Sequence, residues 1–327
     1  AKTHSRYNDL VICSCGGPIN LADGTCRLAG TTYLGQAKVG RGSSDGNDRA
    51  VLIIFTIIAI YPVLWVVTVA FSGQQNLAFA DLPADPGFFD RLRAVLPWPE
   101  QWSLKNFTDV LTEQPFLRWM LNSAFVAAIT TLGGVFLACT AAYAFSRFSF
   151  PGRKAGMMSF LISQMFPGTL LLVPIYIIVV SWLGLGNNYL GLILVYSVTA
   201  IPFCVWMMKG YFDTIPLEIE ESAIMDGASR QVIFFKIILP LAKPAVAVTA
   251  LFSFMTAWNE FILAATFLEE ESMYTAPVGL KFFVGGFASN WGYFAAGSII
   301  ISIPVVLLFL YLQKYLVSGL TAGGVKG

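Results

Sequence analysis

The sequence has few charged residues, since Asp, Glu, Lys and Arg make up only 12% of its 327 positions. A soluble domain carries about 25% charged residues, whereas 56% of this chain is hydrophobic. The formal net charge is only +1, so the charge balance indicates no nucleic acid or other polyanion as a partner. The composition instead indicates a protein that lies in a lipid membrane.

Cysteine and histidine are also scarce. The five cysteines are too few and too scattered for a disulfide framework. Cys13, Cys15 and Cys26 lie with the single histidine, His4, near the start of the sequence, but their C-x-C…C spacing fits no zinc pattern well. We therefore predict no metal site, and we expect the glycine-rich segment 1–49 to be a disordered cytoplasmic tail.

Signatures of catalysis and nucleotide binding are missing as well. The sequence has no P-loop of the form GxxxxGK[ST], no HExxH, and no Ser/His or paired-Asp arrangement in its apolar segments. We therefore expect no ATP binding by that route, and an intramembrane enzyme is disfavoured.

Long apolar segments are what the sequence has in place of these features. Because a helix rises about 1.5 Å per residue, about 20 apolar residues cross a hydrocarbon core of about 30 Å. Six segments are long enough, at about 50–71, 121–145, 156–181, 189–208, 244–267 and 293–313. The sequence thus predicts an all-α membrane protein with six transmembrane helices. The apolar run of the first segment is too long for a cleavable signal.

Prolines interrupt two of these segments, with Pro167 and Pro174 in the third and Pro202 in the fourth. Proline in a spanning helix frees a carbonyl and kinks the helix. Two interpretations stay open: bent helices around a cavity, or ordinary packing, since proline is common in spanning helices.

The charges in the loops predict the orientation, because Lys and Arg are enriched in cytoplasmic loops. Loops 146–155 and 209–243 are basic and should be cytoplasmic, whereas 182–188 has no charge and 268–292 is acidic, so both should be external. Both termini are then expected in the cytoplasm. The segment 72–120 is then external, and four of its aromatic residues are expected to pack against the bundle: Trp98, Trp102, Phe107 and Trp119.

One charged stretch, EESAIMDGASRQVIFFKIILPLAKP, lies between two apolar segments. Thr214 can cap a first helix, Pro216 fits its first turn, Gly227 can end it in a left-handed conformation, and Ser229 can cap a second helix. The pattern predicts a helix–turn–helix elbow at about 214–237 on the cytoplasmic face. From these residues alone, the elbow is either a solvated loop or a docking surface for a cytoplasmic partner.

The spacing E-S-A-x₃-G-x₉-I-x-L-P in this stretch resembles the EAA coupling motif of permease subunits of binding-protein-dependent ABC importers. It departs from that motif only at Ser222, a small residue in place of alanine. The resemblance implies that the elbow fits a cleft on an ATPase subunit and passes the closure of that subunit to the spans. The residues implicated in this ATPase coupling are Glu221, Ser222, Ala223, Asp226, Gly227, Ile237, Leu239 and Pro240.

Other stretches resemble the permeases of sugar importers, and more closely the smaller, MalG-type permease of maltose and maltodextrin transporters. They are AAYAFSRFSFPGRK, QMFPGTLLLVPIY, TAWNEFILA and QKYLVSGLTAGGVKG. The resemblance covers roughly 50–327 and implies the type I ABC importer permease (MetI-like) fold, with the transmembrane type-1 core at about 117–312.

The resemblance also implies partners in the bacterial inner membrane and on both sides of it. They are a second, larger permease, an ATPase homodimer that holds ATP and Mg, and an external sugar-binding protein. No cofactor is expected on this chain itself. Transport would proceed by alternating access, as the two permeases rock when the ATPases close.

Two further groups of residues are candidates by resemblance. The external loop at about 269–292 is implied to reach into the binding protein, and its aromatic and amide side chains suit sugars; the alternative is that they anchor the loop at the membrane interface. The tail is implied to contact the ATPase subunits, and the alternative there is a frayed terminus. The loop candidates are Tyr274, Phe282, Phe283, Asn290 and Trp291, and the tail candidates are Gly323, Gly324 and Lys326.

Glu260, next to Asn259, is the one acid well inside a predicted span. An intramembrane carboxylate is a functional candidate by default, for a sugar hydroxyl, a contact between helices or a proton relay. The resemblance of the WNEF stretch favours a structural polar contact at the interface between permeases. A proton-coupled transporter is the main rival class, but it needs more ionisable residues along its path. A channel would not need the elbow.

Overall fold

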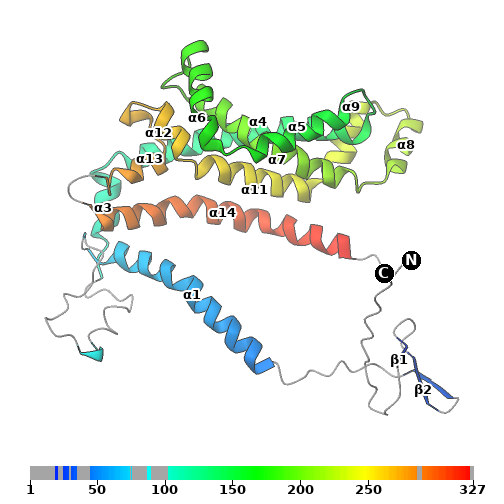
Figure 1. Cartoon of the computed structure of the whole chain (residues 1–327), viewed down its shortest axis with the longest axis horizontal. Helices are drawn as coiled ribbons and strands as arrows, with labels where there is room; N and C mark the ends of the chain where they lie inside the picture. Colours follow the sequence, from blue (N-terminus) through cyan, green and yellow to red (C-terminus); the bar gives the residue numbers. More distant parts are fainter. Residues whose placement is uncertain are drawn as a thin grey trace, which may run out of the picture. The chain divides into compact units, whose positions relative to one another are not determined.

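A computed structural model describes residues 19–20, 25–28, 31–34, 45–73, 75, 87–89, 102–285 and 289–324 (Figure 1). The chain divides into two compact units, 1–61 and 62–327. Trp98 and Lys326 lie outside the described residues.

The first unit contains a small antiparallel sheet, in the order β1–β2–β3. The strands are β1 (Ile19–Asn20), β2 (Thr25–Leu28) and β3 (Thr31–Leu34), with Cys26 opposite both Ile19 and Tyr33. The sequence predicts a disordered tail over 1–49, whereas these three strands are paired. The threonines and Tyr33 of β2 and β3 favour extended backbone, and only two residues separate the paired Leu28 and Thr31, the spacing of a tight hairpin.

From α1 onward the described chain is mostly helical. The first helix, α1 (Asp45–Phe71), contains Pro62, and the last, α14 (Trp291–Gly324), contains Pro304. The elements between them are α3 (Lys105–Thr112), α4 (Phe116–Arg147), α5 (Arg153–Met165), α6 (Gly168–Tyr176), the π-helix η1 (Ile177–Trp182), α7 (Tyr189–Phe212), α8 (Leu217–Met225), α9 (Arg230–Ile233), the π-helix η2 (Phe234–Ile238), α10 (Leu239–Leu241), α11 (Lys243–Trp258), α12 (Ile262–Phe267), the 3₁₀ turn η3 (Glu271–Met273) and α13 (Ala276–Lys281).

Four helices of the described chain are long and apolar enough to cross a membrane: Arg49–Phe71, Phe116–Arg147, Tyr189–Phe212 and Trp291–Tyr315. Two bent helix pairs, Arg153–Met165 with Gly168–Trp182 and Arg230–Leu241 with Lys243–Trp258, bring the number to six if each pair is one span. The predicted all-α membrane fold is confirmed for the described chain from α1 onward, and each of the six predicted segments overlaps one of these four helices or two pairs.

Two of the spans are interrupted and are not single straight helices. The pair α5 and α6–η1 bends by 101° at Phe166 and Pro167, where proline removes a backbone donor. The predicted fifth span at 244–267 is wrong as one continuous helix. It consists of α11, a break at 259–261 and the short α12.

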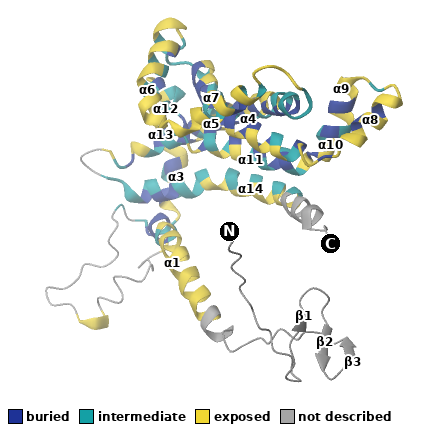
Figure 2. Cartoon of the chain, turned by 45° about the vertical axis from the view of Figure 1, so that its right-hand side comes forward, coloured by how far each residue is buried: buried dark blue, intermediate teal, exposed yellow. Residues whose placement is uncertain are grey.

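The core lies where α4 packs along α7 and α11, with α14 beside α11. Figure 2 shows buried residues on the facing sides of these helices and exposed ones on their outer sides. Small residues on α4, such as Ala138 and Ala142, are fully buried and let the neighbouring helices approach closely. Large apolar side chains such as Leu132 and Leu170 point outward, as expected for a surface that faces lipid.

Aromatic residues before α4 and in its first turn connect this helix to neighbouring segments of the chain. Trp119 is buried and donates from its indole nitrogen to the carbonyl of Glu271, at 3.0 Å. Phe107 of α3 packs on Phe71, with ring centroids 4.7 Å apart. Trp102 also contacts Phe71 but stays 57% exposed, so the predicted packing is confirmed for Phe107 and Trp119 and is only partial for Trp102.

Candidate functional site

The predicted elbow exists, as α8 followed by a turn, α9, η2 and α10 (Figure 1). Its first helix has Pro216 at the N-cap and no side-chain cap hydrogen bond. The predicted capping role of Thr214 is therefore wrong, because the Thr214 hydroxyl instead donates to the carbonyl of Tyr211 at 2.7 Å, at the end of α7. Glu218 and Glu220 lie in the first turn of α8, where negative charge is favourable.

The turn after α8 has the hydrogen bonds of a Schellman motif. The Ala228 N–H donates to the Ala223 carbonyl at 3.0 Å, and the Gly227 N–H donates to the Ile224 carbonyl at 2.9 Å. Gly227 has φ +83°, so the predicted left-handed conformation is confirmed. Ser229 caps α9 by accepting from the Val232 N–H at 3.4 Å, as predicted. The sharp bend of the elbow follows from these local interactions.

The motif residues of α8 divide between its two sides. Glu221, Ser222 and Asp226 are exposed, whereas Ala223 is buried. The Ser222 hydroxyl donates to the Glu218 carbonyl within the helix at 2.7 Å, so serine fits in place of alanine without an unsatisfied hydroxyl. Beside the acids, Met225 is 86% exposed, which adds apolar surface to a charged projection.

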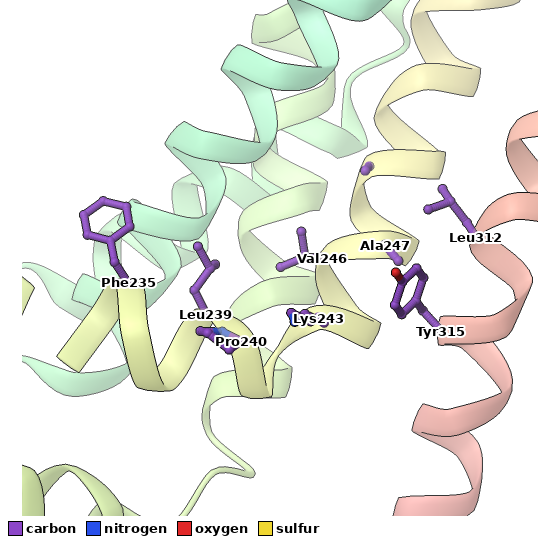
Figure 3. A pocket seen from close by; sticks show the side chains of 9 residues that line it. Phe235, Leu239, Pro240, Lys243, Val246, Ala247, Leu312 and Tyr315 are labelled. Carbon is purple, nitrogen blue, oxygen red and sulfur yellow. The ribbon is translucent and has the colours of Figure 1, made fainter. Parts of the chain in front are cut away.

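The last motif residues lie at the base of the elbow. Ile237 and Leu239 are partly buried and pack against the hydrophobic core, and Pro240 is exposed. Leu239 and Pro240 line a groove of about 420 Å³ with Leu312 and Tyr315 of α14 on its other side (Figure 3). The structure therefore brings the end of the motif next to the last spanning helix.

Sequence reasoning missed Glu220, which precedes the motif. Its carboxylate accepts from the Tyr143 hydroxyl at 2.8 Å and from the Arg147 Nε at 2.5 Å. A second Arg147 nitrogen donates to the carbonyl of Ile215 at 2.9 Å. The Arg147 and Glu220 side chains are only 7% and 11% exposed. The available sequence signal was Arg147, a charged residue at the end of a predicted span.

A second polar contact joins the ends of α4 and α7. Asp213 accepts from the Ser146 hydroxyl at 2.6 Å and from the Lys209 ammonium at 2.5 Å. Partial burial acts to raise the pKa of Asp213, but these hydrogen bonds and the positive charges of Lys209 and Arg153 outweigh it, so the pKa is lowered. The carboxylate is therefore ionised at neutral pH.

Glu260 lies in the break between α11 and α12. Its carboxylate accepts from the backbone N–H groups of Leu263 at 2.8 Å and Ala264 at 3.0 Å, and from the Tyr196 hydroxyl at 2.8 Å. It therefore supplies acceptors to the first turn of α12 and links it to α7. Asn259 is exposed at the C-cap of α11. This geometry gives Glu260 a structural polar contact within the chain.

The aromatic residues of the loop at 269–292 have different environments. Phe283 is only 4% exposed, in the core with Phe116 and Trp119, so it cannot offer a face to a sugar, contrary to expectation. Tyr274 is partly buried and stacks on Phe282, which is 59% exposed, with centroids 5.2 Å apart.

The other two loop candidates lie at the start of α14. The Asn290 N–H donates to the Phe283 carbonyl at 2.7 Å, and the Trp291 N–H donates to the Gln75 carbonyl at 3.2 Å. Gly323 and Gly324 form the end of α14, so they belong to a helix rather than to an irregular tail. Within the described residues, no three His, Cys, Asp or Glu side chains cluster to hold a metal.

Comparison with known proteins finds a match between residues 132–322 and the family model described as "Binding-protein-dependent transport system inner membrane component". The chain is 39% identical to the galactooligosaccharides transport system permease protein GanQ of Bacillus subtilis, over 84% of this chain and 93% of the relative. It is 38% identical to the maltodextrin transport system permease protein MalD of Streptococcus pneumoniae, over 89% and 98%. It is 36% identical to the maltose/maltodextrin transport system permease protein MalG of Escherichia coli K12, over 84% and 94%.

A solved structure has a similar fold. It is the crystal structure of a bacterial ABC transporter involved in the import of the acidic polysaccharide alginate, which matches with a TM-score of 0.68 and 25% identity. The match covers 83% of this chain and 95% of the chain in that structure.

Proposed function

The chain belongs to the binding-protein-dependent transport system inner membrane components, and on this premise we propose that it is one permease half of an ATP-driven importer of oligosaccharides of the maltose and maltodextrin class. Its relatives are named as permeases of transport systems, and it is a transport component rather than an enzyme. We propose that a second, larger permease completes the translocation pathway and that an external binding protein delivers the sugar.

The elbow is the observation that carries this proposal. Its tip combines exposed acids, Glu221 and Asp226, with the exposed apolar side chains of Ile224 and Met225. A purely solvated loop has no need of apolar side chains at its tip, whereas a docking surface uses both kinds of contact. The proposed partner is an ATPase homodimer, which would hold ATP and Mg while this chain binds no cofactor.

The substrate class is proposed from the relatives. MalD and MalG are named for maltodextrin and maltose, and GanQ for galactooligosaccharides, so oligosaccharides of glucose are the first choice and those of galactose the second. In the loop at 269–292, the stacked pair Tyr274 and Phe282 offers a partly exposed aromatic face. We propose this pair, with Asn290 and Trp291, as the surface that meets the binding protein or its sugar.

The rest of the proposed arrangement concerns the membrane. The chain would lie in the bacterial inner membrane with both termini in the cytoplasm. The end of α14, with Gly323, Gly324 and the following Lys326, would contact the ATPase subunits. The hydrogen bonds of Glu260 support a structural role and count against a proton relay, because all three of its donors belong to the folded chain itself.

Reconstitution tests the proposal. The complete complex in proteoliposomes should take up labelled maltotriose, and binding protein loaded with maltotriose should stimulate its ATPase. Gly227→Pro forbids positive φ and should abolish both stimulation and uptake while the complex still assembles. Gly210→Ala is the matched control, because a Cβ at Gly210 meets nothing within 4 Å and its φ is ordinary. Full coupling in Gly227→Pro would show that the elbow is an ordinary loop.

A further inference from the structure

Helix α8 has very little apolar contact with the bundle. The structure describes all nine of its residues, of which only Glu220 and Ala223 are buried. Leu217, Ile224 and Met225 are more than half exposed. Apolar burial ordinarily holds a short helix in place. Ala223 is the one apolar side chain of α8 that is buried, and Ile219 is still 38% exposed, so the apolar anchor of this helix is weak. The other buried side chain of α8 is a carboxylate with specific partners.

These partners come from the end of α4, more than 70 positions earlier in the sequence. Glu220 uses one carboxylate oxygen for the Arg147 Nε and the other for the Tyr143 hydroxyl. Arg147 uses a second nitrogen for the carbonyl of Ile215, at the start of the segment that leads into α8. The guanidinium thus bridges the side chain and the backbone of one segment, which needs the planar fork of arginine.

The same residues also connect to α7. A third nitrogen of Arg147 donates to the Ser146 hydroxyl at 3.2 Å, and that hydroxyl donates to Asp213 at 2.6 Å. One hydrogen-bonded chain therefore passes from α8 through the end of α4 to the end of α7. Buried charges are costly unless they are fully paired, so this arrangement favours one fixed geometry over a range of loose ones.

We propose that Glu220, Arg147 and Tyr143 form a clasp that fixes α8 to the end of α4, so that a force on the elbow moves α4 directly. The inference rests on the proposed function, because the force comes from the ATPase partner. The three are positioning residues, which touch neither sugar nor nucleotide. The motif residue Glu221 is exposed and free to meet the proposed partner, whereas its neighbour Glu220 is buried against the bundle.

The first test measures coupling in the reconstituted complex with the variants Glu220→Gln, Arg147→Lys and Tyr143→Phe. Glu218→Gln is the matched control, because Glu218 is an exposed acid in the same first turn. The readout is the number of maltotriose molecules imported per ATP hydrolysed, for complexes that retain the ATPase. We expect at least a tenfold lower ratio for Glu220→Gln, a several-fold lower ratio for Arg147→Lys and Tyr143→Phe, and the wild-type ratio for Glu218→Gln.

A merely structural role predicts a different result. The variants would then yield a smaller amount of assembled complex. The assembled fraction would import at the wild-type ratio, and that result would overturn the clasp. If Glu220→Gln does not assemble, the milder Tyr143→Phe and Arg147→Lys decide in the same way. An unchanged ratio in both of them rejects the proposal.

A second measurement does not depend on the substrate. A spin label is attached to a Met225→Cys variant of the full chain in proteoliposomes without the ATPase, after the native cysteines have been replaced, because Met225 is 86% exposed on α8. Its mobility should rise clearly in Glu220→Gln and stay at the wild-type level in Glu218→Gln. If wild type imports no sugar but the label still loosens, the proposed function fails and the clasp stands. If the label does not respond, the clasp fails whatever the complex transports.

Discussion

At the scale of single residues, Gly227 and Gly279 are required for different physical reasons. Gly227 has φ +83° and open space where a Cβ would lie, so only its backbone conformation demands glycine. Gly279 has an ordinary φ, but a Cβ there would overlap the indole ring of Trp119. Alanine tests these two requirements separately, one at the elbow and one in the core.

Gly227→Ala should weaken the elbow without disturbing the bundle. A left-handed conformation costs an L-residue about 1–2 kcal/mol, and a Cβ at this position meets no neighbouring atom within 4 Å. We expect nearly normal amounts of protein in the membrane and a several-fold lower ATPase stimulation. Measuring both on one preparation separates the effects, and a large loss of protein would contradict this account.

Gly279→Ala should instead destabilise the whole bundle, because α13 must move away from Trp119 of α4. Overpacking of a core costs about 1–3 kcal/mol, so we expect a lower thermal unfolding midpoint in detergent. Gly168→Ala, where a Cβ meets no neighbour within 4 Å, is the control and should unfold like wild type. Equal midpoints for both variants would show that Trp119 can move aside at little cost.

At the scale of elements, hydropathy predicted the spans well but not their breaks. The average over 244–267 is apolar, so one polar pair inside it did not indicate that the helix ends at Trp258 and restarts at Ile262. Glu260 accepts from two backbone N–H groups at the start of α12, and its third donor, Tyr196, lies more than 60 positions earlier. Local sequence reasoning cannot identify such a partner.

The elbow shows the same distinction. Gly227 and Ser229 act on backbone groups within a few residues of themselves, and the sequence predicted both. The prediction that Thr214 caps α8 was wrong. Its hydroxyl can bond to backbone groups on either side, and it donates to the carbonyl of Tyr211. Glu220 was missed, because its partners Tyr143 and Arg147 lie on another helix. Sequence therefore predicts the turn of the elbow, and the fold determines its attachment.

Glu260→Ala should destabilise the chain through α12. The variant leaves two backbone donors and the Tyr196 hydroxyl without their acceptor, and losing a helix cap alone costs about 0.5–2 kcal/mol. We expect a clearly lower unfolding midpoint for Glu260→Ala and a smaller change for Glu260→Gln, which keeps one acceptor. Glu269→Ala, an exposed acid in the following loop, is the control.

Transport by the same variants addresses the role of the charge. If Glu260 is structural, Glu260→Gln should retain most of the uptake of wild type. Loss of all uptake in Glu260→Gln, with normal assembly, would instead require a negative charge at this position during transport.

At the scale of the whole molecule, the loops pair as the charge rule predicts. Arg147, which closes α4, binds Glu220 in the segment 209–243, so two basic segments meet at one end of the bundle. At the other end, the Asn187 N–H donates to the carbonyl of Phe267 at 2.9 Å, and the Asn187 side chain accepts from the Glu269 N–H at 3.1 Å. The uncharged loop and the acidic loop therefore meet at that end, and Figure 1 shows α8 and α12 at opposite ends of the bundle.

Because the loops meet in these pairs, the bundle has only two possible orientations, and the basic end should be cytoplasmic. The orientation can be tested with single cysteines in a chain whose five native cysteines are replaced. One variant carries Met225→Cys on the elbow, and the other carries Glu271→Cys in the acidic loop. Both positions are exposed, and the chain is expressed without its proposed ATPase and binding-protein partners, so accessibility depends only on the side of the membrane. A membrane-impermeant maleimide should label intact cells at position 271 only, and permeabilised cells at both. Labelling of position 225 in intact cells would put the elbow outside, where no ATPase could reach it, and would reject the coupling function together with the orientation.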